Sequence, residues 1–212
     1  MNRTVSSATF VESIAARSDP YQWSIRLGAM LFIAALTAAA AQVSLPLPFT
    51  EVPFTFQPMV VLLGGLVLGS RLGPGSQLLY LLAGIGGLPV FAASPVLPPG
   101  AMRLLGPTGG FLMAYPIAAW LVGTLAERGF DRRYVTSTVA MLAGLLVVYG
   151  CGALWLAFFA RSVTAGASVV PTGFQAALAT GVYPFVLADV VKLSAAAGIS
   201  PTLWRLVGAE KR

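Results

Sequence analysis

The sequence contains no histidine and only one cysteine, Cys151. The absence of histidine excludes histidine-based catalysis, histidine metal ligands and the usual proton switch near neutral pH. A single cysteine cannot form an intramolecular disulfide, and Cys151 lies in the apolar run 147–154, where we interpret it as a packing residue rather than a reactive thiol. We therefore expect no metal site and no bound cofactor.

Charged residues are also scarce. They make up 9% of the 212 residues, against about 25% in a typical soluble domain, while 57% are hydrophobic. This composition predicts an integral membrane protein. The net charge of +6 does not indicate nucleic-acid binding, because the basic residues are scattered through short loops and form no stripe.

Long apolar segments predict transmembrane helices, since an outer-membrane strand would show only a weak two-residue alternation. Six such segments lie near residues 25–45, 57–69, 75–91, 108–126, 134–160 and 174–198. We therefore predict an all-α membrane protein, a six-transmembrane-helix bundle, whose residues 25–200 form the substrate-binding domain. Residues 1–24 and 201–212 are expected to be cytoplasmic segments.

Irregular backbone is predicted in three of these segments. The second is short, the third contains Gly84, Gly86 and Gly87, and the sixth contains Pro184. Short, glycine-broken segments are how transporters place irregular backbone beside a cavity. Pro184 is expected to kink or unwind the sixth helix just before Asp189. In the first segment, residues 39–41 could mimic a signal-peptide cleavage site, although the segment is nearly a full span long.

The basic residues predict which ends of the helices face the cytoplasm. With six spans and both termini inside, the cytoplasmic segments hold ten of them, Arg3, Arg17, Arg26, Arg71, Arg128, Arg132, Arg133, Arg205, Lys211 and Arg212. The external loops hold Arg103 and Arg161. This positive-inside bias requires an even number of spans. We expect a multi-pass protein of the bacterial inner (plasma) membrane with both termini cytoplasmic.

Asp189 and Lys192 are the first candidate site residues. They lie in an otherwise almost uncharged apolar stretch, and a spacing of three places them on one face of a helix. Ionisable residues in lipid are costly, usually face the bundle interior and are functional-site candidates by default. The alternative is a structural ion pair that tethers helices.

Three other motifs are candidates for binding. Four prolines make the external loop 45–58 extended and stiff, suited to lie over the bundle mouth as a lid, or else a plain connector. Arg103 precedes a Gly-Pro-Thr-Gly-Gly turn in which Thr108 can cap the next helix and the amides of Gly109 and Gly110 could face an anion. That turn could equally be helix-start punctuation, and it is not a P-loop, because no Gly-Lys-Ser/Thr follows.

Small residues at a spacing of four mark the first helix: Ala34 with Ala38, and Ala35 with Ala39. Such faces let helices approach closely in lipid. They indicate either a docking face for another membrane protein or alanine-rich packing within this chain.

Four of these motifs together resemble the BioY family, the biotin-binding membrane subunits (S components) of energy-coupling factor transporters. They are Val-Pro-Phe-Thr-Phe-Gln at 52–57, Gly-Gly-Leu-Pro-Val-Phe at 86–91, Gly-Pro-Thr-Gly-Gly-Phe at 106–111, and Pro184-Phe with Asp189 and Lys192. The similarity covers roughly residues 25–200. It implies six helices and a biotin site that opens outward, built from the outer helix ends, the loop between the first and second helices and the loop between the third and fourth.

The resemblance also implies the site residues. Asp189 and Lys192 match the family's Asp-x-x-Lys, Arg103 its basic residue before the glycine-rich turn, and Gln57 the end of its Val-Pro-x-Thr-x-Gln. The chain departs from related proteins after Pro-Val-Phe: it has Ala92, Ala93 and Ser94 where they can carry an amide, so Ser94 is expected to substitute. The predicted substrate-binding set is Asp189, Lys192, Arg103, Gln57, Phe91, Ser94, Thr108 and Gly109.

Partners follow from the same resemblance. A coupling transmembrane subunit is expected to dock on Ala34, Ala35, Ala38 and Ala39, and separate ATP-binding subunits are expected to energise uptake, since no nucleotide motif is present. Membrane lipid and biotin complete the expected partners.

The chemistry of biotin fits these residue types independently of the resemblance. A carboxylate suits the ureido N–H donors, and an ammonium or guanidinium suits either the ureido carbonyl or the terminal carboxylate. We predict a high-affinity biotin uptake subunit that performs no chemistry on its ligand. The alternatives are a proton-coupled carrier using Asp189, and a non-transport membrane assembly protein, in which the charge pair has no solute role.

Overall fold

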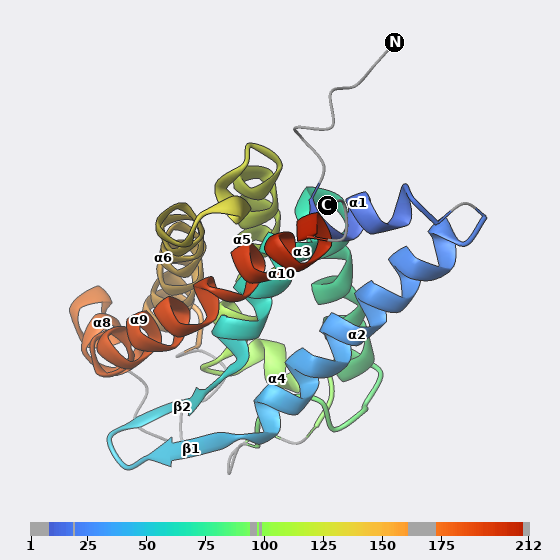
Figure 1. Ribbon diagram of the computed structural model, residues 1–212. Coiled ribbons are helices and arrows are strands. Elements are labelled where there is room, and N and C mark those ends of the chain that lie inside the picture. The colour runs from blue at the N-terminus through green and yellow to red at the C-terminus, as the bar shows by residue number, and fades with distance from the viewer. Residues whose placement is uncertain (1–8, 19, 94–96, 98, 161–172, 210–212) are drawn as a thin grey trace.

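The computed structural model describes residues 9–18, 20–93, 97, 99–160 and 173–209. Helices pack side by side as a bundle, and one short hairpin of strands lies at its lower end in Figure 1. The elements are α1 (Phe10–Ala15), α2 (Gln22–Gln42), β1 (Ser44–Leu47), β2 (Thr50–Thr55), α3 (Gln57–Ile85), α4 (Met102–Leu105), α5 (Gly109–Glu127), η2 (Phe130–Arg132), α6 (Tyr134–Phe158), α8 (Phe174–Gly181), α9 (Tyr183–Ala197) and α10 (Ile199–Ala209).

The described helices have the length and surface of a membrane protein. Five segments are long and apolar enough to cross a bilayer: α2, α3, α5, α6 and the stretch Tyr183–Leu206. Large apolar side chains such as Leu31, Leu146 and Leu187 point outward, which is expected where the surrounding solvent is lipid. Apart from the hairpin, the prediction of an all-α membrane protein is confirmed.

Helix α3 is two antiparallel arms joined at Gly69. This residue has φ +86° and ψ −177°, outside helical geometry. The Nε2 of Gln57 lies 2.7 Å from the Oη of Tyr80, although 23 residues of straight helix would separate them by about 35 Å. The arms 57–68 and 70–85 are therefore separate crossings of the bundle, which gives five or six candidate spans. The predicted third segment was misplaced, because it starts directly after the reversal and ends at Ile85 rather than at residue 91.

The reversal is made possible by close packing and by one carboxylate. Glycine tolerates the positive φ at position 69, and a Cβ on Gly123 of α5 would overlap the backbone of Gly69. The Oε1 of Glu127 accepts hydrogen bonds from the backbone N and the Oγ of Ser70, at 2.8 and 2.7 Å. Glu127 thus satisfies a donor at the start of the second arm that would otherwise have no helical partner.

The last predicted segment is broken where expected. Helix α8 ends at Gly181, Val182 has non-helical angles (φ −127°, ψ −64°), and α9 begins at Tyr183 with Pro184 in its first turn. Proline lacks the N–H that a continuous helix would need here. The predicted break before Asp189 is confirmed.

The proline-rich loop is more ordered than predicted. Residues 44–55 form a two-stranded antiparallel sheet in which Ser44 pairs with Thr55 and Leu47 with Thr50. The register shifts between Leu45 and Leu47, on either side of Pro46, which has no N–H to contribute to the ladder. The backbone is extended as expected, but the pairing was not predicted. The first helix also ends earlier than predicted, at Gln42, because residues 44–47 belong to β1.

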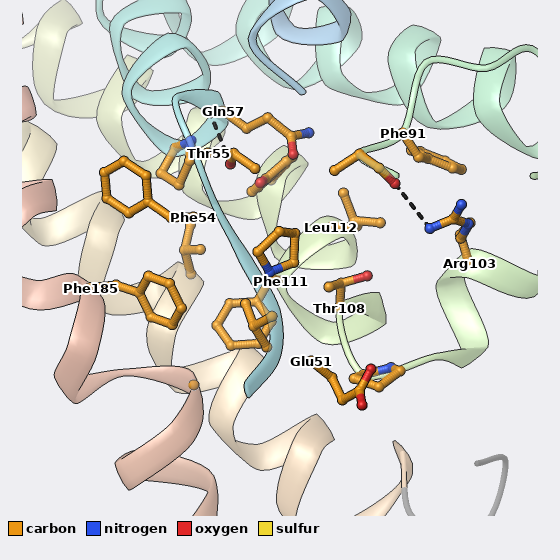
Figure 2. A pocket seen from close by; sticks show the side chains of 18 of the residues that line it. Glu51, Phe54, Thr55, Gln57, Phe91, Arg103, Thr108, Phe111, Leu112 and Phe185 are labelled. Carbon is orange, nitrogen blue, oxygen red and sulfur yellow. Dashed lines mark hydrogen bonds between the residues drawn. The ribbon is translucent and has the colours of Figure 1, made fainter. Parts of the chain in front are cut away.

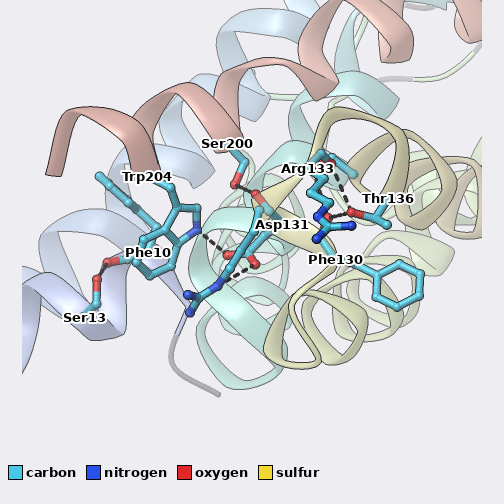
Figure 3. A network of polar contacts seen from close by, with 10 residues as sticks. Phe10, Ser13, Phe130, Asp131, Arg133, Thr136, Ser200 and Trp204 are labelled. Carbon is cyan, nitrogen blue, oxygen red and sulfur yellow. Dashed lines mark hydrogen bonds and ion pairs between the residues drawn. The ribbon is translucent and has the colours of Figure 1, made fainter. Parts of the chain in front are cut away.

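A buried polar cluster ties the two described ends of the chain together (Figure 3). Asp131 of η2 is fully buried, and its Oδ2 accepts a 2.6 Å hydrogen bond from Nε1 of Trp204 in α10. Phe10 of α1 packs edge-on against Trp204, with 5.9 Å between ring centroids. Burial raises the pKa of Asp131, while the Trp204 hydrogen bond and the charge of Arg132 oppose that shift. Helices α1 and α10 therefore lie at the same end of the bundle, away from the hairpin.

Candidate functional site

A cavity opens at the hairpin end of the bundle and encloses about 860 Å³, including its open mouth. Strand β2 and the helices α3, α5, α6 and α9 contribute to its wall (Figure 2). Its aromatic lining consists of Phe54, Phe91, Phe111, Tyr115, Tyr149 and Phe185. Its polar lining consists of Glu51, Thr55, Gln57, Arg103, Thr108 and Asp189. A largely apolar cavity with a few convergent polar groups is the usual design of a small-molecule site.

Asp189 supplies a buried carboxylate to the cavity wall. The residue is only 4% exposed. Its Oδ2 accepts a 2.6 Å hydrogen bond from the Oη of Tyr149, and its Oδ1 lies 2.5 Å from the Nζ of Lys192. Each oxygen of a carboxylate can accept more than one hydrogen bond, so Asp189 retains acceptor capacity toward the cavity. These two partners fix its orientation.

Lys192 lies behind the lining rather than in it. Its Nζ donates a 2.6 Å hydrogen bond to the carbonyl oxygen of Thr55 in β2 and lies 4.0 Å from the centroid of the Phe54 ring. Lys192 is not among the described residues that line the cavity. Its ammonium therefore joins α9 to the hairpin, while the carboxylate that it neutralises faces the interior. The predicted charge pair exists, but its two members have different surroundings.

Arg103 lies across the cavity from Phe185 (Figure 2). Its side chain is largely buried, and Nη1 donates a 2.9 Å hydrogen bond to the carbonyl oxygen of Ala92. Burial lowers the pKa of the guanidinium, which nevertheless remains cationic near neutral pH. This contact holds the short helix α4 against the chain that follows Phe91.

Gln57 and Phe91 belong to one packed unit. Gln57 donates to the Oη of Tyr80, which in turn donates to the carbonyl oxygen of Val90 at 3.3 Å. The ring of Phe91 packs edge-on against Tyr80, with 5.5 Å between centroids. Two chain segments that are far apart in the sequence are thereby fixed on one side of the cavity.

The glycine-rich turn differs from the prediction. Thr108 lines the cavity, but its side chain makes no capping hydrogen bond within the described part of the chain. The amide of Gly109 donates to the carbonyl oxygen of Gly106 at 3.0 Å, and a Cβ there would overlap the Leu104 carbonyl oxygen. A Cβ on Gly110 would overlap Trp155. These glycines permit close packing of α4 and α6 against α5, and neither is among the described residues lining the cavity. The structure thus gives these glycines a packing role, and the anion-binding role of their amides stays a prediction.

The remaining predicted residues are Ser94 and the alanines of α2. Ser94 lies outside the described residues. Ala34 and Ala38 are partly buried against the core, whereas Ala35 and Ala39 are exposed on the outer side of α2. The two small-residue pairs therefore face in different directions.

Several lining residues were not found by sequence reasoning. Tyr149 holds the Asp189 carboxylate, and Phe54 and Phe185 stack with 6.5 Å between their centroids. A tyrosine within an apolar helix needs a partner for its hydroxyl, and this was the available signal for Tyr149. Glu51 gave no comparable signal, because it lies in a loop whose pairing was not predicted.

Comparisons with known proteins agree on one family. The family model described as BioY family matches residues 15–209. A probable biotin transporter BioY of Pyrococcus horikoshii is 42% identical over 173 residues, which cover 82% of this chain and 91% of that protein. The biotin transporter BioY of Thermotoga maritima is 35% identical over 172 residues, covering 81% of this chain and 91% of the relative.

One solved structure has the same fold. It is the crystal structure of the S-component for biotin from an ECF-type ABC transporter. The TM-score is 0.74 at 23% sequence identity, with 89% of this chain and 95% of the other covered. At this identity the match establishes the shared fold.

The ion pair yields a stability prediction. Lys192→Met leaves the Asp189 carboxylate buried without its countercharge and should lower the free energy of unfolding by about 3–5 kcal/mol. The double variant Asp189→Asn/Lys192→Met removes both charges and should recover most of that loss. The loss and its recovery are measured by unfolding the purified proteins in mixed micelles with increasing amounts of dodecyl sulfate. Arg128→Met, at an exposed position, is the matched control. Wild-type stability of Lys192→Met would show that the pair does not hold the hairpin.

Proposed function

The chain belongs to the BioY family, and on that premise we propose that it is a high-affinity biotin-binding subunit, the S component of an energy-coupling factor transporter. It binds the vitamin and performs no chemistry on it. Energy comes from separate ATP-binding subunits through a coupling transmembrane subunit. The observation that carries the proposal is a buried, charge-paired carboxylate, Asp189, in the wall of an aromatic cavity at one end of a membrane bundle.

The polar groups of biotin match polar groups in the cavity lining. The ureido group has two N–H donors, which suit the Asp189 carboxylate, and the apolar sulfur ring suits the walls formed by Phe111 and Phe185. The acyl chain ends in a carboxylate, which suits the guanidinium of Arg103. Lys192 contributes from behind, by holding the Asp189 carboxylate in place.

The same contacts argue against a proton-coupled carrier. Such a carrier needs a carboxylate that gains and loses a proton during each cycle. Asp189 instead is held by the ammonium of Lys192, 2.5 Å away, and by the hydroxyl of Tyr149, which donates to it. A carboxylate fixed by two partners suits ligand recognition better than a proton-transfer cycle.

Asp189→Asn should abolish tight biotin binding in a protein that still folds. Loss of a charged hydrogen-bond partner in a dry site costs about 2–5 kcal/mol, or roughly thirtyfold to several-thousandfold in affinity. Equilibrium binding of labelled biotin to purified protein measures the change. Asp131→Asn alters an equally buried carboxylate at the other end of the bundle and should leave affinity unchanged. Wild-type affinity of Asp189→Asn would place the ligand elsewhere.

We expect the guanidinium of Arg103 to bind the carboxylate of biotin. A comparison of two ligands tests this contact. Biotin amides lack the terminal charge, and the wild-type protein should prefer free biotin over a biotin amide by roughly tenfold or more. Arg103→Ala should lose most of this preference, as measured by competition between the two ligands. A variant that keeps the full preference would assign the carboxylate to another group.

Six crossings with both termini in the cytoplasm form the proposed topology. The reversal at Gly69 and the packing of α1 on α10 support an even number of crossings. Arg128 and Arg133 flank η2 and Arg132 lies within it. Because Asp131 of η2 accepts the Trp204 hydrogen bond, these residues lie at the same end as α1 and α10, in agreement with the positive-inside bias. The hairpin and the cavity mouth then face outward in the bacterial inner membrane, with 25–200 as the binding domain between cytoplasmic segments 1–24 and 201–212.

The coupling subunit should dock on the outer small-residue pair of α2. Ala35→Leu and Ala39→Leu add bulk at an exposed face and should weaken complex assembly and uptake while isolated subunits bind biotin normally. Ala38→Leu is the matched control: this residue packs against the core, so its enlargement should disturb the subunit itself. Co-purification of the complex and binding to the isolated subunit separate the effects. If both Ala35→Leu and Ala39→Leu assembled normally, the coupling subunit would not dock on this face of α2.

A further inference from the structure

The inner side of the hairpin packs against the bundle and lines the cavity. Val52 and Thr55 are buried, and Glu51 and Phe54 contribute to the cavity wall. The carbonyl oxygen of Thr55 accepts the hydrogen bond from Lys192. These contacts explain why the hairpin is held against the bundle. They do not explain the composition of its outer side.

The outer side of the hairpin is apolar throughout. Val43 is 57% exposed, Leu45 61% and Phe49 58%, and Pro46 and Pro48 are exposed between them. No charged residue occurs from 43 to 49. Where one face of an antiparallel sheet meets water, that face is normally polar, and exposed edges commonly carry charge. The outer face therefore has the composition expected beside an apolar medium.

The backbone of β1 is also suited to an apolar environment. The strand lies in a two-stranded sheet, so one of its edges has no partner strand in the described part of the chain. An unpaired amide donor is costly away from water. Pro46 and Pro48 have no N–H, which reduces the number of donors that this edge can expose.

The apolar face continues an existing lipid-facing surface. Helix α2 carries exposed Leu31, Phe32 and Leu36 on its way toward the hairpin. Only Val43 separates α2 from β1, and after the exposed Gln42 the exposed Val43 and Leu45 carry apolar side chains on into the hairpin. The hairpin thus begins directly after the end of a helix that is long and apolar enough to span a membrane.

We propose that the outer face of the hairpin, formed by Val43, Leu45 and Phe49, is inserted into the interfacial layer of the membrane that the bundle spans. Amphipathic segments bind that layer by burying their apolar side chains in it. The hairpin is then held on one side by Lys192 and on the other by lipid. A consequence, which rests on the proposed function, is that uncovering the cavity requires these side chains to leave the lipid or to slide within it.

Spin-label accessibility tests the insertion without any ligand. Single cysteines replace Leu45 and Phe49 in a Cys151→Ala background, and the labelled proteins are reconstituted in vesicles of equal parts phosphatidylethanolamine and phosphatidylglycerol. Oxygen concentrates in lipid and a nickel chelate stays in water, so collision rates with the two report the environment. Leu146→Cys, on the lipid-facing side of α6, and Arg128→Cys, at the opposite end, supply the lipid and water references.

Both hairpin labels should collide with oxygen more than with the nickel chelate, with nickel accessibility at least severalfold below that at position 128. Nickel accessibility equal to position 128 at either label would overturn the proposal. Each variant must elute as one species and unfold like the parent; if Phe49→Cys does not, Val43→Cys replaces it. Because biotin is absent, a negative result here is independent of whether the cavity binds biotin.

Discussion

The ion pair between Asp189 and Lys192 joins three elements that are far apart in the chain. Removing two charges from water costs several kcal/mol per ion, and their attraction offsets this only when further hydrogen bonds satisfy both groups. Those bonds are present: Tyr149 of α6 donates to the carboxylate, and the ammonium donates to Thr55 of β2. The pair therefore requires α6, α9 and the hairpin to meet at one place, and the cavity wall forms there. The Asp189 carboxylate faces the cavity, because the Lys192 ammonium is held behind the cavity wall by its hydrogen bond to Thr55 of β2.

Two helices of the bundle are interrupted, and one of the interruptions lies beside the cavity. Helix α3 reverses at Gly69, at the end where α1 packs, whereas the last span is broken at Val182, next to the cavity-lining Gly181. Each interruption has its own means of satisfying the backbone. Glu127 accepts from Ser70 at the first, and Pro184 removes a donor at the second. Irregular backbone at membrane depth is tolerated where it is buried in protein or beside a cavity, and the break at Val182, next to the cavity-lining Gly181, meets that condition.

The sequence was sufficient for features that depend on composition and local rules. Scarcity of charge predicted the membrane, Pro184 predicted the break before Asp189, and a spacing of three predicted that Asp189 and Lys192 would be neighbours. It was insufficient wherever a role depends on a distant partner. Gly109 and Gly110 have the composition of an anion-binding turn, yet their lack of a side chain serves the approach of Leu104 and Trp155. Likewise, nothing local to Asp131 indicates that Trp204 donates to it.

Helix α2 connects features that are otherwise separate. Near its start, Arg26 forms a 2.8 Å ion pair with Glu12 of α1. In its middle, the Oγ1 of Thr37 lies 3.4 Å from the buried amide nitrogen of Gln77, and this contact fixes the rotation of α2 about its axis. In this orientation Ala34 and Ala38 face the core, while Ala35 and Ala39 face outward. At its end, one residue leads into β1. A rigid helix transmits displacement along its axis, so the exposed alanine face and the strand hairpin over the cavity cannot move independently unless the chain bends at Val43.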